Sequence, residues 1–281
     1  MISRFEKEIL VAHALGLTRA QLIAKRTDEL DAALYQPLLD RRAKHEPTAY
    51  IVGYQPFWGL DFIVDRSVLI PRPETELLVE KVIESYSHYL PAGRHGALPV
   101  TRISMADIGT GSGCIAITLA KNLPNVTVIG VDSSKEALKI AQKNAEYHGV
   151  ADRCRFITGD MLEEFTTKAP RRQETQKLDI IVSNPPYIPT EVIETLEPEV
   201  KDWEPRQALD GGKDGLNYIR KLIVNAPNHL SIYPSGSLFL EIGFHQGPAV
   251  IELAEQTGRY SDIKIVKDLN GQDRIFTARV K

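Results

Sequence analysis

Hydrophobic positions in residues 1–50 recur at the spacing of amphipathic helices. The first apolar stripe consists of Ile9, Leu10, Ala12 and Leu15. It stops at Gly16, a residue type that commonly follows a helix, and Thr18 and Gln21 then have the spacing of a capping box. A third, leucine-rich pattern contains Pro37, where we expect a kink or a restart. These patterns predict a small helical module without strands.

Aromatic and β-branched residues replace this pattern over residues 50–70. The apolar groups are Tyr50–Gly53, Phe57–Trp58 and Phe62–Val64. Their short spacing predicts a β-hairpin that leads into the turn-forming segment Ile70–Pro73. Residues 76–85 return to helical spacing, and the Gly- and Pro-rich stretch 91–99 predicts an exposed loop. The hairpin is therefore the candidate linker between two domains.

Strand and helix patterns alternate from residue 103 onward. The predicted strands span residues 103–107, 126–132, 154–158, 179–183, 237–242, 262–267 and 274–280. Helices are expected after the first, second and fifth strands, and after either the third or the fourth. This alternation predicts an α/β, Rossmann-like fold, in which helices cover both faces of a seven-stranded, mostly parallel sheet. The last two strands leave no room for a helix between them, so the final strand should run antiparallel at or near the sheet edge.

A chain of 281 residues is long for one domain, and the patterns divide it into three parts. Residues 1–48 form a helical domain, residues 49–85 a hairpin linker with its connecting helix, and residues 86–281 the α/β domain. The formal net charge of −3 disfavours binding to nucleic acid through phosphate neutralisation. No apolar run is long enough to span a bilayer and the first residues do not resemble a signal peptide. We therefore expect a cytoplasmic protein without a membrane partner. Its two cysteines, Cys114 and Cys154, lack the spacing of metal ligands, so no metal is expected.

A glycine-rich loop follows the first predicted strand of the α/β domain and directly precedes a helix. It consists of Gly109, Thr110, Gly111, Ser112 and Gly113. Glycines let the backbone turn sharply and let a ligand approach closely. Asp132 stands at the end of the next strand, where a carboxylate can accept hydrogen bonds from both hydroxyls of a ribose. The two signals together predict a nucleoside-containing cofactor, and a glycine-rich turn without a ligand is the alternative.

A tetrapeptide, Asn184-Pro185-Pro186-Tyr187, ends the fourth predicted strand of this domain. The two prolines fix φ and remove two backbone donors, so nearby carbonyl oxygens and the side-chain oxygen of Asn184 remain as acceptors. Such an array suits an NH₂ group. If the fourth strand lies beside the first, the tetrapeptide and the glycine loop line one pocket at the topological switch point. A rigid surface turn is the alternative interpretation.

An amide or aromatic amine is a poor nucleophile because its lone pair is conjugated with the adjoining π-system. We therefore expect orientation rather than a general base, with Asn184 Oδ1 and the Pro185 carbonyl holding both N–H bonds of the acceptor. Near-attack positioning can contribute ~7–11 kcal/mol, far more than the ~0.5–1.5 kcal/mol of each hydrogen bond. Tyr187 would stack on the planar acceptor group.

The glycine loop has the spacing G-x-G-x-G rather than the dinucleotide spacing G-x-G-x-x-G. It resembles motif I of the class I S-adenosylmethionine (SAM)-dependent methyltransferases. Together with the Asn-Pro-Pro-Tyr tetrapeptide it resembles the amino-methyltransferases of DNA, rRNA and proteins. Further segments are similar to the peptide chain release factor glutamine methyltransferases, the HemK/PrmC family. These segments are Glu46–Gly53, Phe57–Trp58, Leu69–Glu76 and Glu204–Leu209.

The resemblance covers nearly the whole chain and implies an activity. That activity is transfer of a methyl group from SAM to the N5 amide nitrogen of the glutamine in the Gly-Gly-Gln (GGQ) loop of class 1 release factors, which leaves S-adenosylhomocysteine (SAH). The resemblance also implies cofactor contacts from residues 109–113, Asp132 and Asn184, and from Asp160 and Met161 near the adenine. Residues 184–187 would bind the substrate glutamine, and the N-terminal helices would dock the release factor.

Three other hypotheses remain open. A ribosomal-protein glutamine or an exocyclic amine of a nucleic-acid base is an alternative acceptor for the same chemistry. A SAM-binding or purely scaffolding protein without turnover is the third. The net charge and the non-basic helical domain argue against the nucleic-acid acceptor, so no direct nucleic-acid partner is expected.

Overall fold

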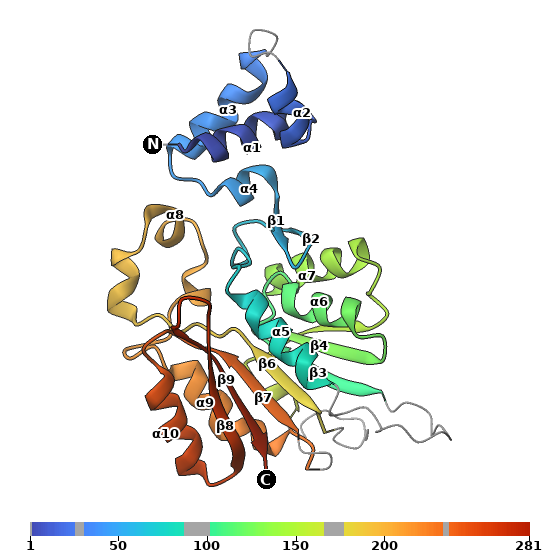
Figure 1. The fold of residues 1–281 in the computed structure, drawn as a ribbon, viewed down its shortest axis with the longest axis vertical. Helices are drawn as coiled ribbons and strands as arrows, with labels where there is room; N and C mark the ends of the chain where they lie inside the picture. The colour runs from blue at the N-terminus through green and yellow to red at the C-terminus, as the bar shows by residue number, and fades with distance from the viewer. Residues whose placement is uncertain (1, 26–30, 87–101, 166–176, 233–235) are drawn as a thin grey trace.

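The computed structural model describes five stretches of the chain, residues 2–25, 31–86, 102–165, 177–232 and 236–281. Within them a helical N-terminal part precedes a two-stranded hairpin, a connecting helix and a seven-stranded sheet (Figure 1). The loop predicted over residues 91–99 lies outside the described residues.

Four helices lie within the described residues of the N-terminal part. They are α1 (Arg4–Ala14), α2 (Arg19–Ala24), α3 (Ala32–Ala43) and α4 (Thr48–Val52). The predicted capping box starts α2, because Thr18 Oγ1 accepts from the Gln21 N–H and Gln21 Oε1 accepts from the Thr18 N–H. Helix α3 is continuous across Pro37, so the restart that the sequence allowed there is wrong. The Asp31 side chain caps α3 by accepting from the Ala33 N–H, and the proline removes only one intrahelical donor.

The predicted hairpin follows and is confirmed. Its two antiparallel strands and the helix after them are β1 (Tyr54–Phe57), β2 (Leu60–Ile63) and α5 (Thr75–Tyr86). Residues 50–52, which we assigned to the hairpin, are helical instead. Tyr50 is buried in a cluster with Val68 and its hydroxyl donates to the Val68 carbonyl over 2.6 Å, so tertiary packing outweighs the β-propensity of this segment. Gly53, at φ +84°, ends the helix.

The sheet contains the seven strands that the sequence predicts. They are β3 (Ile103–Ile108), β4 (Val126–Asp132), β5 (Cys154–Thr158), β6 (Ile180–Ser183), β7 (Ser237–Glu241), β8 (Tyr260–Lys267) and β9 (Asp273–Val280). The strand order is β5-β4-β3-β6-β7-β9-β8. Strands β3 to β7 pair in parallel, whereas β9 lies between β7 and β8 and is antiparallel to both. The predicted mixed sheet is therefore confirmed, with the final strand next to the edge.

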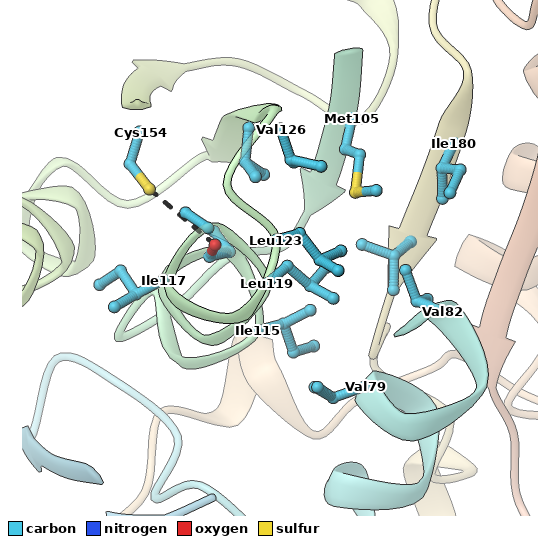
Figure 2. Packing of buried hydrophobic residues seen from close by; sticks show 14 of the residues in the cluster. Val79, Val82, Met105, Ile115, Ile117, Leu119, Leu123, Val126, Cys154 and Ile180 are labelled. Carbon is cyan, nitrogen blue, oxygen red and sulfur yellow. Dashed lines mark hydrogen bonds between the residues drawn. The ribbon is translucent and has the colours of Figure 1, made fainter. Parts of the chain in front are cut away.

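Helices cover both faces of this sheet and enclose two hydrophobic clusters (Figure 1). The helices of this part are α6 (Cys114–Asn122), α7 (Lys135–Tyr147), α8 (Pro198–Lys201), α9 (Asn217–Asn225) and α10 (Gly247–Thr257). Val79 of α5 and Leu119 of α6 belong to the cluster on one face, together with the free thiol of Cys154 (Figure 2). Ile219 of α9 and Val250 of α10 belong to the cluster on the other face. Alternate residues of β3, β6 and β7 point into the two clusters, as expected of a sheet buried on both sides.

Helix α4 connects the helical part to the rest of the molecule. Ile51 packs against α1 and α3, whereas Tyr50 belongs to a cluster with Ile140 of α7. A second connection is polar: the Arg42 guanidinium of α3 pairs with the Glu199 carboxylate of α8. The N-terminal helices therefore contact two separate segments of the α/β part.

Candidate active site

The carboxyl ends of three neighbouring parallel strands meet at one edge of the sheet. Strand β3 lies between β4 and β6, so the glycine loop after β3 is flanked by Asp132 at the end of β4 and by Asn184 directly after β6. From β3 the chain continues to β4 on one side of it, whereas β6 lies on the other side. This reversal of strand order is the topological switch point, where open α/β sheets bind ligands. A cavity of about 600 Å³ opens at this edge. Its volume lies within the range of small-molecule sites.

Most of the predicted site residues line this cavity. They are Gly109, Gly111, Asp132, Asp160, Met161, Asn184 and Pro186. The remaining predicted residues are not part of its wall. They are Thr110, Ser112, Gly113, Pro185 and Tyr187. The structure thus brings the two sequence motifs together, and it separates residues that face the cavity from residues that support it.

The glycine loop and Asp132 are joined by hydrogen bonds. The Gly111 N–H donates to Oδ2 of Asp132 over 2.9 Å, and the Ser134 N–H donates to Oδ1 over 2.9 Å. Burial raises the pKa of Asp132 above its ordinary value, while these backbone donors oppose that shift. A carboxylate oxygen has more than one lone pair, so Asp132 can accept further hydrogen bonds from the cavity side.

Gly113, at the start of α6, has a packing role. Its φ is +80°, and a Cβ placed there would lie 2.9 Å from Ile117 Cδ1 and 3.1 Å from Ala141 Cβ. Helices α6 and α7 approach each other at this point. The residue is thus required by the backbone conformation and by the close approach of α7.

Asp107, the second-last residue of β3, supports the loop from below and was not assigned a role from the sequence. It is fully buried, and its Oδ2 accepts from Thr110 Oγ1 over 2.6 Å and from the Ala116 N–H over 3.2 Å. Thr110 therefore points into the protein rather than into the cavity. Burial raises the pKa of Asp107 to about 7. Its Oδ1 has no hydrogen-bond partner among the described residues.

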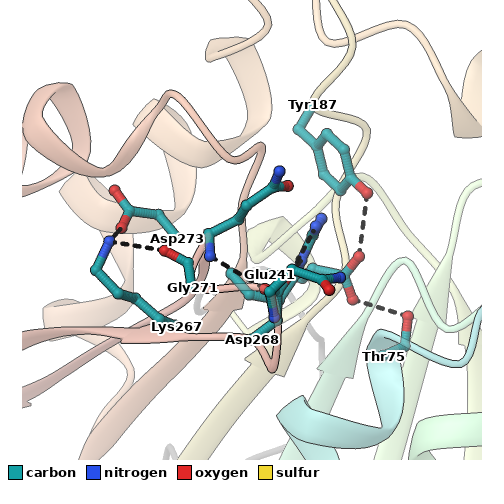
Figure 3. A network of polar contacts seen from close by, with 10 residues as sticks. Thr75, Tyr187, Glu241, Lys267, Asp268, Gly271 and Asp273 are labelled. Carbon is teal, nitrogen blue, oxygen red and sulfur yellow. Dashed lines mark hydrogen bonds and ion pairs between the residues drawn. The ribbon is translucent and has the colours of Figure 1, made fainter.

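Asn184 is held by residues from two other elements. Its Nδ2 donates to Oγ1 of Thr75, the first residue of α5, over 3.0 Å. Thr75 Oγ1 in turn donates to Oε2 of Glu241, the last residue of β7, over 2.7 Å. The hydroxyl of Tyr187 donates to Oε1 of the same carboxylate over 3.1 Å (Figure 3). The sequence analysis assigned neither Thr75 nor Glu241 a role. Thr75 lies in a segment that resembles the family, whereas the only sequence signal for Glu241 is its position at the end of an apolar strand.

A further part of the cavity lining comes from two segments whose roles the sequence did not assign. They contribute Ser67, Val68, Leu69, Pro205, Gln207 and Ala208. The segments are tied together by Arg72, whose Nη2 donates to Oε1 of the buried Glu204 over 2.5 Å. Gln207 Nε2 donates to Ser133 Oγ over 2.6 Å and so joins the second segment to the loop after β4. Both segments overlap the family-like stretches 69–76 and 204–209.

Metal and thiol chemistry have no visible basis in the part of the chain that the structure describes. Its His, Cys, Asp and Glu side chains form no group of three that could hold a metal ion. Burial raises the pKa of both cysteines, Cys114 and Cys154, to about 12, so neither is a thiolate near neutral pH. None of the described helices is both long enough and apolar enough to cross a membrane.

Comparison with known structures supports the fold. A methyltransferase from Pyrococcus furiosus is 18% identical and superposes with a TM-score of 0.52 over 89% of this chain and 98% of that chain. The N-terminal domain of human METTL16, solved in complex with SAH, is 17% identical and has a TM-score of 0.52 over 79% of this chain and 76% of that chain. Together with the strand order, this confirms the class I methyltransferase fold.

Comparison of sequences identifies the family. The methyltransferase domain profile matches residues 101–220, and the PrmC N-terminal domain profile matches residues 2–53. The release factor glutamine methyltransferase of Geobacter sulfurreducens is 42% identical over 99% of this chain and 90% of its own length. A second, from Moorella thermoacetica, is also 42% identical, over 98% of this chain and 90% of its own length. The chain therefore belongs to the family of release factor glutamine methyltransferases.

Proposed function

We propose that this chain transfers the methyl group of SAM to the N5 amide nitrogen of the glutamine in the GGQ motif of class 1 peptide chain release factors. One observation carries the proposal: Asn184 lines the cavity, and one N–H of its Nδ2 donates to Thr75. This bond fixes which end of the amide faces Thr75, and it leaves Oδ1 as the acceptor that Asn184 can offer to an incoming NH₂ group. Family membership supports a release factor as the source of that group.

The residues around the cavity suit the proposed cofactor. SAM supplies an electrophilic methyl group when it is bound. Asp132 can accept from ribose hydroxyls, and Gly111 leaves room for close approach of the ligand. Asp160 and Met161 line the cavity beyond β5, where a thioether can cover an adenine ring by dispersion. We propose that Gly109 contributes to the same site, and that Thr110, Ser112 and Gly113 act by shaping the loop.

The proposed chemistry depends on positioning. The substrate amide nitrogen needs no prior deprotonation if Asn184 Oδ1 and the Pro185 carbonyl accept its two N–H bonds and direct its lone pair at the methyl group. The nitrogen releases one of these two protons to solvent after the transfer, which leaves the N-methyl amide and SAH. Effective positioning of this kind contributes ~7–11 kcal/mol. Pro186 shapes the cavity wall, and we propose that Tyr187 supports the planar amide from its position against Glu241.

The partner is expected to contact more than the cavity. We propose that the helical part, residues 1–48, docks the release factor, that residues 49–85 link it to the catalytic part, and that residues 86–281 carry the chemistry. Helix α4 and the pair of Arg42 with Glu199 join these parts. The cytoplasmic location expected from the sequence stays a prediction.

The experiment is a transfer assay with tritiated SAM. Purified protein is mixed with a release factor whose GGQ glutamine is present, and with a matched release factor in which that glutamine is replaced by alanine. We expect label only in the first. Equal labelling of both would contradict the proposal, and labelling of a ribosomal protein, naked DNA or rRNA in place of the release factor would assign the same chemistry to a different acceptor.

A further inference from the structure

The Asn184 side chain is the end of a buried polar chain that begins at the Glu241 carboxylate and passes through Thr75. Figure 3 shows the link between Thr75 and Glu241. Thr75 is 2% exposed and Glu241 is 1% exposed. Thr75 Oγ1 bridges the other two residues, because it lies 2.7 Å from Glu241 Oε2 and 3.0 Å from Asn184 Nδ2. The three residues come from the start of α5, the end of β7 and the end of β6, so no local sequence constraint brings them together.

The chemistry of the threonine hydroxyl gives this chain a direction. A hydroxyl has one proton to donate and lone pairs with which to accept. An ionised Glu241 can only accept, so the Thr75 hydroxyl donates its hydrogen bond to this carboxylate. Thr75 Oγ1 can then only accept from Asn184, which turns the NH₂ end of the Asn184 amide toward Thr75. The oxygen end of that amide is consequently directed away from Thr75.

We propose that Thr75 and Glu241 are positioning residues that hold the Asn184 amide with Oδ1 presented to the methyl-accepting nitrogen. This inference rests on the proposed function, because it concerns the orientation of the group that would receive the substrate N–H. An inverted Asn184 amide would present two N–H donors to a substrate NH₂, and two sets of donors cannot form a hydrogen bond. The orientation therefore separates a productive site from an unproductive one.

The surroundings of Glu241 bear on its charge. Tyr187 donates to its second oxygen, and the positive charge of Arg274 on β9 favours the ionised form. Burial is the largest influence and raises the pKa of Glu241, with a smaller contribution in the same direction from Glu74. Cys114 of α6 also interacts electrostatically with it. Burial raises the pKa of Tyr187 as well, so this hydroxyl stays a donor.

Protonation of Glu241 would reverse the polarity of the chain. A protonated carboxyl donates to Thr75 Oγ1, and the Thr75 hydroxyl is then free to donate to Asn184. The Asn184 amide would respond by turning its oxygen toward Thr75. Since the raised pKa of Glu241 lies above that of an exposed glutamate, we expect the rate of methyl transfer to fall on the acid side at a higher pH than an exposed carboxylate would give.

The test compares Thr75→Val with Thr75→Ser. Valine preserves the shape of threonine but removes the hydroxyl, whereas serine keeps the hydroxyl. Thr118→Val is the matched control, because Thr118 is equally buried in α6 and its hydroxyl has no partner among the described residues. For Thr75→Val we expect kcat to fall ~10²-fold while the Kd for SAM stays within about 2-fold, and Thr75→Ser and Thr118→Val to keep kcat within about 3-fold of wild type.

Glu241→Gln provides a second, independent readout. The amide cannot ionise but keeps an oxygen that can accept from Thr75, so the variant should lose the acid limb that wild type shows in its pH profile. Thermal unfolding of each variant identifies any that fail to fold. A folded Thr75→Val that keeps wild-type kcat, or a folded Glu241→Gln with an unchanged pH profile, would overturn the inference.

The variants are compared on whichever acceptor the wild-type protein methylates. If wild type methylates an acceptor other than the GGQ glutamine, the proposed partner is wrong but the variant ratios still test the positioning of Asn184. If wild type binds SAM and methylates none of the acceptors, the proposed function and this inference both fail. A defect confined to the polar chain gives a different result: wild type is active, and Thr75→Val is slow although its Kd for SAM is that of wild type.

Discussion

The backbone N–H of Gly111 donates to Oδ2 of Asp132 over 2.9 Å, which joins the loop after β3 to the end of β4. The same carboxylate lines the cavity. Asp132 thus holds the glycine loop in place with one lone pair and leaves others for a ligand. A single side chain therefore couples the shape of the loop to the recognition of whatever binds there.

Replacing Asp132 by alanine should weaken the binding of SAM. The variant loses both the ribose acceptor and the anchor of Gly111, and each hydrogen bond to a charged group contributes ~1.5–3 kcal/mol, so we expect the Kd for SAM to rise roughly 10- to 100-fold. Isothermal titration calorimetry measures this directly. Asp152→Ala, at an exposed position, is the control and should leave the Kd unchanged. A normal Kd for the Asp132 variant would remove this residue from the proposed cofactor site.

Asn184→Ala should lower kcat and leave the Kd for SAM nearly unchanged, in contrast to the Asp132 variant. The side chain that would orient the substrate amide is lost, while the glycine loop and Asp132 remain, so we expect kcat to fall ~10²–10³-fold with little change in the Kd for SAM. Single-turnover methylation of a release factor and calorimetry with SAM give the two quantities. Unchanged turnover would exclude Asn184 from the mechanism.

Periodicity in the sequence was sufficient to predict the sheet. Apolar runs separated by helical patterns gave all seven strands, and the short connection between β8 and β9 gave the antiparallel final strand. The prediction failed where tertiary contacts outweigh local preference. Tyr50 has high β-propensity, yet its burial against Val68 places it in α4, and Pro37 lies within an uninterrupted α3.

The candidate site was predictable only where its residues stand next to strand ends. Asp132 and Asn184 occupy such positions, and strand order alone brings them together. Thr75 lies 109 residues from Asn184 along the chain, so no spacing rule could have linked the two. Thr110 was expected to contact the cofactor, but the direction of its side chain depends on the buried Asp107, which a linear motif does not reveal.

Gly113→Ala should destabilise the fold more than Gly149→Ala. Both glycines have positive φ, +80° and +69°, so both substitutions introduce backbone strain. Only at Gly113 would the new Cβ also collide, with Ile117 and Ala141, whereas nothing lies within 4 Å at Gly149. We expect ~1 kcal/mol of destabilisation at Gly149 and a further ~1–3 kcal/mol at Gly113, measured from urea unfolding. Equal losses for the two variants would show that α7 moves aside without penalty.

Asp107 should make the stability of the protein depend on pH on the acid side of neutrality. Its pKa is raised from 3.8 to about 7 by burial, so the folded protein holds this proton over a range in which the unfolded chain has released it. The stabilisation from the bound proton is therefore full below the unfolded value and is lost as the pH rises through the folded value. Over that interval the loss amounts to ~1 kcal/mol per pH unit.

Asp107→Asn isolates this effect. Asparagine keeps an acceptor for Thr110 and for the Ala116 N–H but cannot ionise, so it lacks the buried charge that wild type acquires as the pH rises. We expect the free energy of unfolding of wild type to fall relative to that of the variant between about pH 4 and pH 7, and the difference to level off above that interval. Urea titrations of both proteins across this range give the difference, in which the contributions of all other titrating groups cancel. Parallel pH dependences would mean that Asp107 titrates as an exposed carboxylate and does not hold its proton beneath the glycine loop.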